Sequence, residues 1–578
     1  MFKSENKVCQ NCQKEFTIDP EDFEFYEKIK VPSPTFCPEC RMIRKMCFRN
    51  ERTLYKRQCD ATGKDIISVY SSDKSYKIYD QKYWWSDEWG AEEYAVHYNW
   101  SVSFFKQLQS LIQKVPWSNM VSTNSINSEY CNSVLNCKKS YLIFAAMNVE
   151  DSAYGVHVDF TKDSFDIDFS VKNEFCYEII QCSECYRVFF SAFSIRCLDS
   201  IFLRDCRDCN HCFGCVGLRN KSYFIFNKHY SKEDYFKELK KYNTGNFSIL
   251  EDLKQRFQSF RLHFPYKYAR LYHSIESSGD NSKEVKNCFN CFDAIGEKVE
   301  DSRFMYLIYG NSVNNSQSIY TVSAAELCYD SISIRQCQNI LFSKKIWTGH
   351  HIRYSINCHS SSNLFGCVGL RHKQYCILNK QYTKEEYKEL VPKIIEHMNS
   401  MPFIDKKGRV YKYGEFFPPE LSPFCYNETI AQEYFPLTKE QAIEKGYKWK
   451  EPETRNYQID IQTQELPDNI KDVSDDILGK IIQCGHTKFN GNDILESTCN
   501  EQCTTAFKVI DSELEFYRKM NLPLPRLCPN CRHYQRIKQR NPLKLWHRKC
   551  MCGGRTSDNG IYKNTIEHFH GNQQCPNE

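Results

Sequence analysis

Short apolar segments recur at a nearly regular interval in the middle of the chain. Between residues 137 and 230 they repeat every 10–12 residues, and polar turn residues follow each one. The segments are KKSYLIF, EDSAYGV, KDSFDID, NEFCYEII, SECYRVFF, LDSIFLRD and NKSYFIF. Their β-branched, aromatic and cysteine residues are typical of short strands. Evenly spaced strands suit a β-solenoid or an all-β sandwich. We favour the solenoid, because no Asn-Gly hairpin signal interrupts the series.

This middle region is duplicated with an offset of 152 residues. CFGCVGLRNKSYFIFNKHYSKEDYF from Cys212 matches LFGCVGLRHKQYCILNKQYTKEEYK from Leu364. A helical connector is expected after each copy, since Ser231 and Thr383 each precede an acidic first turn, as in a capping box. The polar, acidic segment over residues 456–480 is expected to be a linker.

The two ends are duplicated as well, with an offset of 491 residues. CQKEFTIDPEDFEFYEKIKVPSPTFCPECR from Cys12 aligns without a gap with CTTAFKVIDSELEFYRKMNLPLPRLCPNCR from Cys503. The same register continues to Cys59 and Cys550. The chain thus has a cysteine-rich end, two middle copies and a second cysteine-rich end.

The sequence therefore predicts a mainly β, multidomain protein. Zinc-ribbon or treble-clef-like domains at both ends flank two tandem β-solenoid-like repeats with helical connectors. The expected segments are an N-terminal zinc-ribbon domain (1–60), an aromatic-rich connector (61–117), repeat 1 (118–230), a helical connector (231–281), repeat 2 (282–382), a helical connector and linker (383–475) and a C-terminal zinc-ribbon domain (476–578).

Composition indicates the localisation of the protein and the redox state of its cysteines. The chain of 578 residues carries a net charge of only +5, so any basic surface must be local. It opens without a secretory signal and contains no apolar run of the ~18 residues that a membrane span needs. We therefore expect a soluble, cytoplasmic protein without a membrane partner. Its 32 cysteines are then expected to be reduced, as metal ligands or as small buried groups.

Two cysteine pairs near the N-terminus have the spacing of a zinc site. Cys9 and Cys12 are separated by two residues, as are Cys37 and Cys40. Four thiolates in two such pairs can surround a tetrahedral Zn²⁺ ion. A closed site of this kind stabilises a fold and leaves no coordination position for catalysis.

The C-terminal end carries a related but less regular set. Cys499 and Cys503 have a three-residue spacer and are expected to pair with Cys528 and Cys531. The fourth ligand stays open, because Cys484 and His486 lie just upstream and could substitute or join. A third, looser site is expected at Cys550, Cys552, His568, His570 and Cys575.

Four further cysteines, Cys206, Cys209, Cys212 and Cys215, are spaced by two residues each, like the start of an iron–sulfur run. Their counterparts in the second copy include Ser361 and Leu364, which cannot hold such a cluster. We therefore expect thiols that line the solenoid interior, with an iron–sulfur cluster or an extra zinc site as the alternative.

Basic residues follow both second cysteine pairs. They are Arg41, Arg44, Lys45 and Arg49 after Cys40, and Arg532, Arg536, Lys538, Arg540 and Arg548 after Cys531. Guanidinium groups on one helix face suit phosphate oxygens, so the runs predict nucleic-acid binding, with RNA favoured over DNA. Alternatively, the basic residues only balance the charge of the zinc thiolates.

No P-loop, dinucleotide-binding or hydrolase motif is present, which favours a binding protein over an enzyme. A protein-interaction scaffold on the solenoid is the main alternative to nucleic-acid binding, and a redox or hydrolytic enzyme is a more distant one. FCPECRMIRKMCFRNERTLYKRQCDATGKDIISVY, YDQKYWWSDEW, LCPNCRHYQRIKQRNPLKLWHRKC and the FGCVGLR repeats resemble a group of uncharacterised bacterial zinc-ribbon proteins. The resemblance implies zinc but no reaction. It also implies a continuation past Glu578 with another cysteine pair, so that the third zinc site would be incomplete here.

Overall fold

The structure, a computed structural model, describes residues 2–451, 458–489, 495–497, 499 and 501–546. The chain forms two compact units that do not follow its linear order. Unit 1 combines Met1–Met120 with Lys267–Glu451 and Pro542–Leu545, and unit 2 combines Val121–Tyr266 with Pro452–Asn541 and Trp546–Glu578. Each unit holds one solenoid and one cysteine-rich module. The N-terminal module is therefore grouped with the second solenoid, and the C-terminal module with the first.

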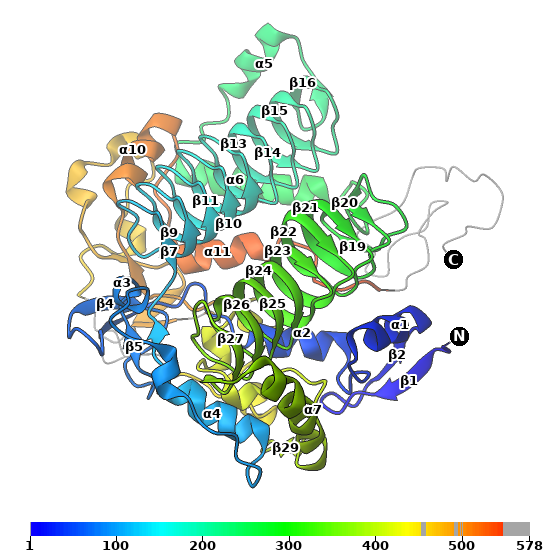
Figure 1. The fold of residues 1–578 in the computed structure, drawn as a ribbon. Coiled ribbons are helices and arrows are strands. Elements are labelled where there is room, and N and C mark those ends of the chain that lie inside the picture. The colour runs from blue at the N-terminus through cyan, green and yellow to red at the C-terminus, as the bar shows by residue number, and fades with distance from the viewer. Residues whose placement is uncertain (1, 452–457, 490–494, 498, 500, 547–578) are drawn as a thin grey trace, which may run out of the picture. The chain divides into compact units, whose positions relative to one another are not determined.

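Both middle copies form parallel β-solenoids, each followed by one antiparallel strand at its C-terminal end, which confirms the predicted fold class (Figure 1). The first solenoid consists of β7 (Ser122–Thr123), β8 (Asn132–Leu135), β9 (Tyr141–Met147), β10 (Ala153–Asp159), β11 (Phe165–Val171), β12 (Tyr177–Ile180), β13 (Tyr186–Ala192), β14 (Leu198–Arg204), β15 (Asn210–Val216), β16 (Ser222–Ile225) and β17 (Lys228–His229). The second consists of β18 (Leu271–Tyr272), β19 (Gly279–Asp280), β20 (Ser282–Lys286), β21 (Cys291–Glu300), β22 (Tyr306–Asn314), β23 (Gln317–Glu326), β24 (Tyr329–Leu341), β25 (Lys344–Arg353), β26 (His359–Phe365), β27 (Gln374–Ile377) and β28 (Lys380–Gln381).

The first solenoid is built from three-residue sides. Parallel partners lie 12 residues apart, as between Ala153 and Phe165, and φ is positive at every third residue from Asn124 to Phe226. Each turn therefore has four corners. A left-handed backbone costs a non-glycine residue roughly 1–2 kcal/mol. Ladder hydrogen bonds help to offset this cost, since a corner amide such as that of Phe160 donates to a carbonyl of the preceding turn.

The side chain two residues before each corner points into the solenoid. These interior positions hold valine, isoleucine, leucine, cysteine and serine, and they form one buried cluster with small polar groups between the apolar ones. The polar groups are satisfied: Ser164 donates to the Lys162 carbonyl at 2.7 Å and accepts from the amide of Cys176 at 2.9 Å. Cysteine suits the same positions, because it is small, apolar and a weak donor to carbonyls.

The repeated FGCVGLR motif now has a structural explanation. Both of its glycines fall at left-handed corners in each copy, at Gly214 and Gly217 and at Gly366 and Gly369. At Gly366 a side chain would also collide with the ring of Phe104, because an added Cβ would lie 2.8 Å from it.

The two cysteine-rich modules share one plan, a two-stranded antiparallel sheet followed by two helices. The N-terminal module contains β1 (Glu5–Val8), β2 (Glu15–Ile18), α1 (Pro20–Ile29) and α2 (Pro38–Met46). The C-terminal module contains β31 (Ile482–Gln483), β34 (Ala506–Phe507), α10 (Asp511–Met520) and α11 (Pro529–Ile537). The first helix of each module ends at a left-handed residue, Lys30 or Asn521. The second begins with proline after a cysteine N-cap, a treble-clef-like arrangement.

The connectors contain the expected helices. Ser231 caps α5 (Lys232–Leu239), which α6 (Phe247–Arg261) follows, and Thr383 forms a capping box at the start of α7 (Lys384–Ser400). The remaining strands and α-helices described in unit 1 are β3 (Tyr55–Gln58), β4 (Asp65–Ser68), β5 (Ile78–Tyr79), α3 (Gln81–Trp84), α4 (Phe104–Lys114), β6 (Trp117–Ser118), β29 (Phe403–Ile404), β30 (Val410–Tyr411), α8 (Ile430–Tyr434) and α9 (Lys439–Glu444). None of the helices in the described part of the chain has the length and apolarity needed to cross a bilayer.

The predicted linker over residues 456–480 is wrong in its described part. Leu466, Ile470, Val473 and Ile477 are buried in the same apolar cluster as α10. Their spacing of four, three and four residues is that of an amphipathic helix, but the segment forms only short 3-10 turns. Its polar, acidic composition therefore gave the wrong prediction of a linker.

Candidate metal centres

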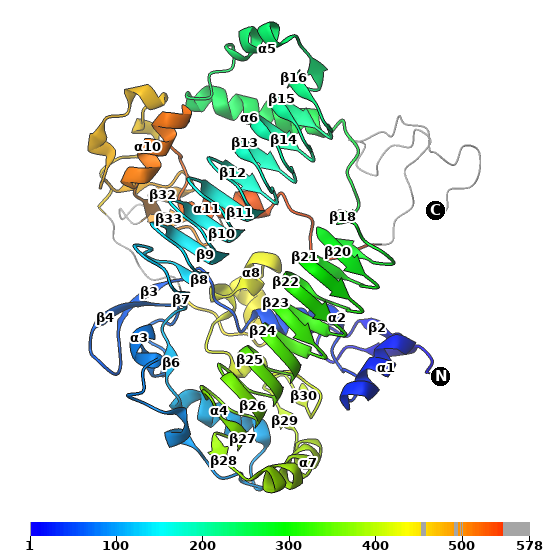
Figure 2. The same ribbon diagram turned by 45° about the horizontal axis from the view of Figure 1, so that its top comes forward.

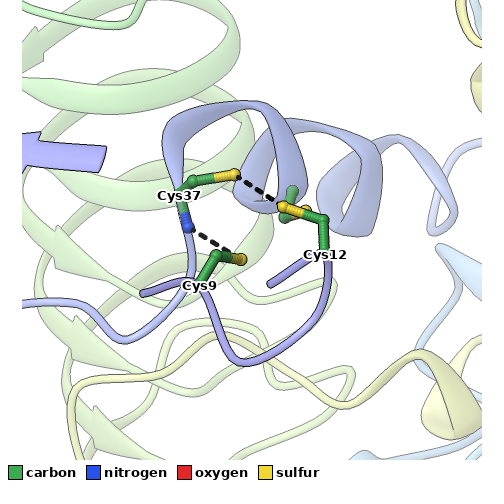
Figure 3. Close-up of side chains that lie close together, drawn as sticks. Cys9, Cys12 and Cys37 are labelled. Carbon is green, nitrogen blue, oxygen red and sulfur yellow. Dashed lines mark hydrogen bonds between the residues drawn. The ribbon is translucent and has the colours of Figure 1, made fainter. Parts of the chain in front are cut away.

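The N-terminal module brings Cys9, Cys12, Cys37 and Cys40 together as expected. The first pair lies in the turn between β1 and β2, and the second pair lies at the start of α2. Figure 3 shows the sulfur atoms of Cys9, Cys12 and Cys37 turned toward one another. All four sulfurs lie within 4.8 Å of one another, and those of Cys12 and Cys37 are 3.8 Å apart. A tetrahedron with Zn–S bonds of ~2.3 Å has edges of ~3.8 Å, so the spacing fits a metal such as zinc.

The C-terminal module forms a second cluster from Cys484, Cys503, Cys528 and Cys531. The Cys503 and Cys528 sulfurs are 3.8 Å apart, and those of Cys484 and Cys531 are 3.9 Å apart. The amide of Cys528 donates to the Cys484 sulfur at 3.2 Å, just as the amide of Cys37 donates to the Cys9 sulfur at 3.3 Å. Cys484 is therefore the structural counterpart of Cys9.

The geometry identifies the cysteine that completes the second cluster. Cys484 does so, while Cys499, which the spacing had favoured, lies outside it in a neighbouring group with His486, Glu501 and Cys531. Strand register explains the choice, because Ile482 pairs with Phe507 as Lys7 pairs with Phe16. Each first ligand follows two residues later. The sequence hid this equivalence, since 18 residues separate Cys484 from Cys503 where only two separate Cys9 from Cys12.

The predicted third site, at Cys550, Cys552, His568, His570 and Cys575, lies outside the described residues.

The thiols of each cluster influence one another strongly. Hydrogen bonds from Cys37 and Cys40 lower the pKa of Cys9, whereas the contact with Cys37, then that with Cys9, and burial raise the pKa of Cys40. Hydrogen bonds from Cys484, Cys503 and Cys531 likewise lower the pKa of Cys528. Each cluster thus favours a thiolate beside thiols that stay protonated without a cation. A metal ion removes the repulsion between thiolates, so binding must release protons.

The donor sets fit a soft, tetrahedral cation. All described cysteines are free, and the two clusters contain no disulfide. In each module the second pair lies at a helix N-terminus, where the helix dipole stabilises thiolates. Four protein ligands leave no open position for a substrate, which favours a structural over a catalytic centre.

The basic residues of α2 are buried against the second solenoid. Lys45 contacts Asp330 at 2.5 Å, and Arg44 contacts Asp330 at 3.3 Å and Glu415 at 3.0 Å. Arg41 donates to the hydroxyl of Tyr329 at 2.9 Å. The three basic residues are at most 2% exposed. Figure 2 shows α2 beside β23 and β24, in agreement with these contacts.

The C-terminal module docks on the first solenoid in the same way. Arg536 binds Asp168 at 2.6 Å and Asp166 at 2.7 Å, and Arg532 lies 3.2 Å from Asp166. Burial favours protonation of Asp168, but Arg536 and His533 outweigh it and lower the pKa of this carboxyl. Asp168 therefore remains an anion within the buried network.

The prediction of phosphate contacts is wrong for five of the basic residues, namely Arg41, Arg44, Lys45, Arg532 and Arg536. Their charges are neutralised inside the protein, where a nucleic acid has no access to them. The other basic residues predicted to contact nucleic acid have different surroundings. Arg49 is 11% exposed and donates to Thr321, Lys538 is exposed beside Glu501, and Arg540 stacks 3.8 Å above the ring of Phe169. Arg548 lies outside the described residues.

The cysteines of the DCRDCNHCFGC run line the solenoid interior, as expected. Cys206, Cys209, Cys212 and Cys215 are at most 1% exposed, and each donates to the carbonyl two residues before it. Their spacing of three residues follows the corner-to-corner period of the backbone. They are not among the groups of described residues whose ligand atoms converge on one point.

Comparisons with known proteins assign no family. No protein-family model and no curated protein sequence matches the chain. Among solved structures, one of a protein proposed to be an acetyltransferase from Desulfovibrio desulfuricans G20 matches at 13% sequence identity, covering 50% of this chain and 72% of that chain. Its TM-score of 0.09 means that this likeness carries no argument about fold or function.

Proposed function

We propose that this protein is a zinc-dependent binding scaffold, in which two structural zinc ions hold docking helices against two β-solenoids. The observation that carries the proposal is the burial of the basic residues beside each cluster. Lys45 and Arg536 form ion pairs with solenoid carboxylates, so the modules use their charge to dock on the protein itself. The solenoid surface then remains for a partner, which we propose is a protein.

A groove on the second solenoid supports a protein partner. It has a volume of about 800 Å³ and is lined by every twelfth residue from Asn314 to Gln374, among other side chains. These residues are Asn314, Glu326, Gln338, His350, Ser362 and Gln374. Neighbouring strands are ~4.8 Å apart, so the groove presents a ladder of donors and acceptors. Among the described residues that line it, none is lysine or arginine, which disfavours a polyanion.

Nucleic-acid binding is the second candidate, and it would have to use other residues. Lys538 remains exposed. If the protein binds nucleic acid, its affinity for RNA should fall steeply as the salt concentration rises, because displaced counterions drive such binding. We therefore expect labelled single-stranded RNA to bind weakly at low salt and to dissociate at physiological salt. Tight RNA binding at physiological salt would favour this candidate over the scaffold.

A photo-crosslinking experiment tests the scaffold directly. A photoreactive residue in place of Gln338, within the groove, is expected to capture a defined protein partner in cells. The same residue in place of Glu389, on the exposed face of α7, is the matched control. Equal capture at both positions, or capture at neither, would contradict a partner in this groove.

Elemental analysis tests the proposal that the two cysteine clusters bind zinc. Protein purified without added metal is expected to contain zinc and no iron. Substantial iron would reopen cluster chemistry at the interior cysteines, and the absence of both metals would contradict the proposed centres.

A further inference from the structure

The C-terminal module contains an insertion that has no counterpart in the N-terminal module. The segment between Cys484 and Cys503 includes the hairpin strands β32 (Thr487–Phe489) and β33 (Leu495–Ser497). It also places His486, Cys499 and Glu501 beside Cys531. One ligand atom from each of these four residues lies within 4.8 Å of the others.

We propose that this group binds a second metal ion of the zinc class, which shares the Cys531 thiolate with the four-cysteine centre. The inference rests on the proposed zinc centre formed by Cys484, Cys503, Cys528 and Cys531. Together the two ions would form a dinuclear site with one bridging sulfur.

The distances within the group fit a second tetrahedron. The Cys499 and Cys531 sulfurs are 3.8 Å apart, the same separation as between Cys503 and Cys528 in the first centre. Nδ1 of His486 lies 3.5 Å from Oε2 of Glu501. Zinc bonds to nitrogen and oxygen are ~2.0–2.2 Å, which makes a tetrahedral edge of ~3.4 Å. Both pairs are therefore separated as two ligands of one ion would be.

The N-terminal module shows what the same sulfur does without the insertion. The counterpart of Cys531 is Cys40, whose sulfur accepts a hydrogen bond from the Asn11 amide at 3.2 Å. The Cys40 sulfur thus has a neutral donor as its additional contact, whereas the Cys531 sulfur lies within 4.8 Å of ligand atoms from three further residues. The two modules therefore differ at one sulfur, and the insertion accounts for the difference.

Charge balance also favours a cation between these ligands. A thiolate at Cys499 and a carboxylate at Glu501 together neutralise one Zn²⁺ when His486 is neutral. Glu501 is 8% exposed, and its Oε2 accepts no hydrogen bond within the described part of the chain, although a cation could use it. Its other oxygen, Oε1, contacts Lys538.

Donor chemistry identifies the ion class. Two sulfurs, one imidazole and one carboxylate are ligands that zinc accepts in tetrahedral sites, whereas calcium and magnesium prefer oxygen ligands alone. The proposed ion has four protein ligands. Its role would be to attach the inserted segment to α11 rather than to activate water.

Zinc stoichiometry of the full chain tests the proposal. Zinc-loaded protein is dialysed to constant metal content, and zinc per chain is compared between the wild type and the double variant Cys499→Ser/Glu501→Gln. We expect a loss of one zinc per chain with an unchanged near-UV circular dichroism spectrum, because the four-cysteine centre remains. The matched control Asn11→Ala, at the equivalent sulfur, is expected to lose none.

Two outcomes would overturn the proposal. Unchanged zinc in the double variant would mean that the group is an ion pair beside a free thiol. Loss of zinc together with unfolding of the module would mean that Cys499 serves the first centre. Failure of the proposed function is distinguishable, since Cys503→Ser would then lose no zinc at all.

Discussion

The two modules dock on different solenoids through the same core contacts. In unit 1 the ring of Tyr26 on α1 lies 5.5 Å from that of Tyr329, and in unit 2 the ring of Tyr517 on α10 lies 5.4 Å from that of Tyr177. The two module tyrosines are equivalent in the duplication of the ends, and the two solenoid tyrosines are equivalent in the duplication of the middle. The aromatic contact between module and solenoid is therefore equivalent in the two units.

The ionic contacts differ between the units. Lys45 reaches Asp330, whose counterpart in the first solenoid is Glu178, whereas its own counterpart Arg536 reaches Asp166 and Asp168. The second solenoid has Ser318 and Tyr320 where the first has these two aspartates. The buried carboxylate has thus moved by one solenoid turn. Because an unpaired buried charge is strongly unfavourable, this shift opposes docking of either module on the other solenoid.

Loss of one metal ligand is expected to have the largest effect on stability. Each substitution should affect only the unit that contains the substituted cysteine. Cys12→Ser should unfold the N-terminal module, and Cys503→Ser the C-terminal one, because a structural zinc ion contributes about 10–16 kcal/mol in isolated zinc-finger peptides. Hydrogen exchange should rise in α1 and α2 for the first variant, and in α10 and α11 for the second. Loss of protection in both modules of either variant would show that the modules fold as one.

Removal of a buried carboxylate is expected to have the next largest effect. Asp330→Asn should destabilise docking of α2, and Asp168→Asn docking of α11, each by about 3–5 kcal/mol, since a buried cation loses its partner. Denaturant unfolding followed by hydrogen exchange of each helix measures this. Glu150→Gln is the control: it removes the partner of Lys138 in an exposed pair, and no measurable change is expected. Equal behaviour of all three variants would contradict a special role for the buried pairs.

Acidification is expected to weaken both interfaces more gradually. Burial opposes ionisation of Asp330, but Lys45, Arg44 and Arg41 outweigh it and lower its pKa, as occurs at Asp168. A carboxyl with a lowered folded-state pKa contributes stability that is present above its unfolded pKa of ~4 and is lost as the pH falls through the folded value. A tenfold difference in acid dissociation constant between the folded and unfolded states corresponds to about 1.4 kcal/mol of this stability.

Thermal unfolding between pH 6 and pH 3, with zinc content measured at each pH, checks this expectation. The stability of Asp330→Asn and of Asp168→Asn should fall less with acid than that of the wild type. Equal slopes in all three proteins would show that the two carboxylates do not carry the acid sensitivity.

Much of this architecture could be predicted from local patterns. The two duplications, the short-strand repeat and the paired cysteines of the N-terminal cluster are encoded within short stretches of chain. The capping residues Ser231 and Thr383 were equally predictable, because a cap depends on residues three positions apart. The interior position of Cys206 could also be predicted, because the equivalent segment of the second copy lacks the cysteines that a metal cluster would need.

Contacts between distant segments could not be predicted. Cys484 was hard to identify as a ligand because an insertion separates it from its partners, and only strand register showed its equivalence to Cys9. The basic runs were misinterpreted for a related reason. The same residue pattern describes an exposed phosphate-binding face and a buried docking face, until the partner carboxylates are located.

The sequence by itself determined the repeated solenoid turns, the helix starts and three cysteine pairs, namely Cys9 with Cys12, Cys37 with Cys40 and Cys528 with Cys531. These features depend on neighbours within one turn or one hairpin. Only the tertiary structure decided which module docks on which solenoid and whether Arg41 and Arg532 face solvent. Asp330 lies 285 residues from Lys45, and Asp168 lies 368 residues from Arg536. Desolvation and ion pairing act across space, so their outcome is fixed only when the folded chain brings these charges together.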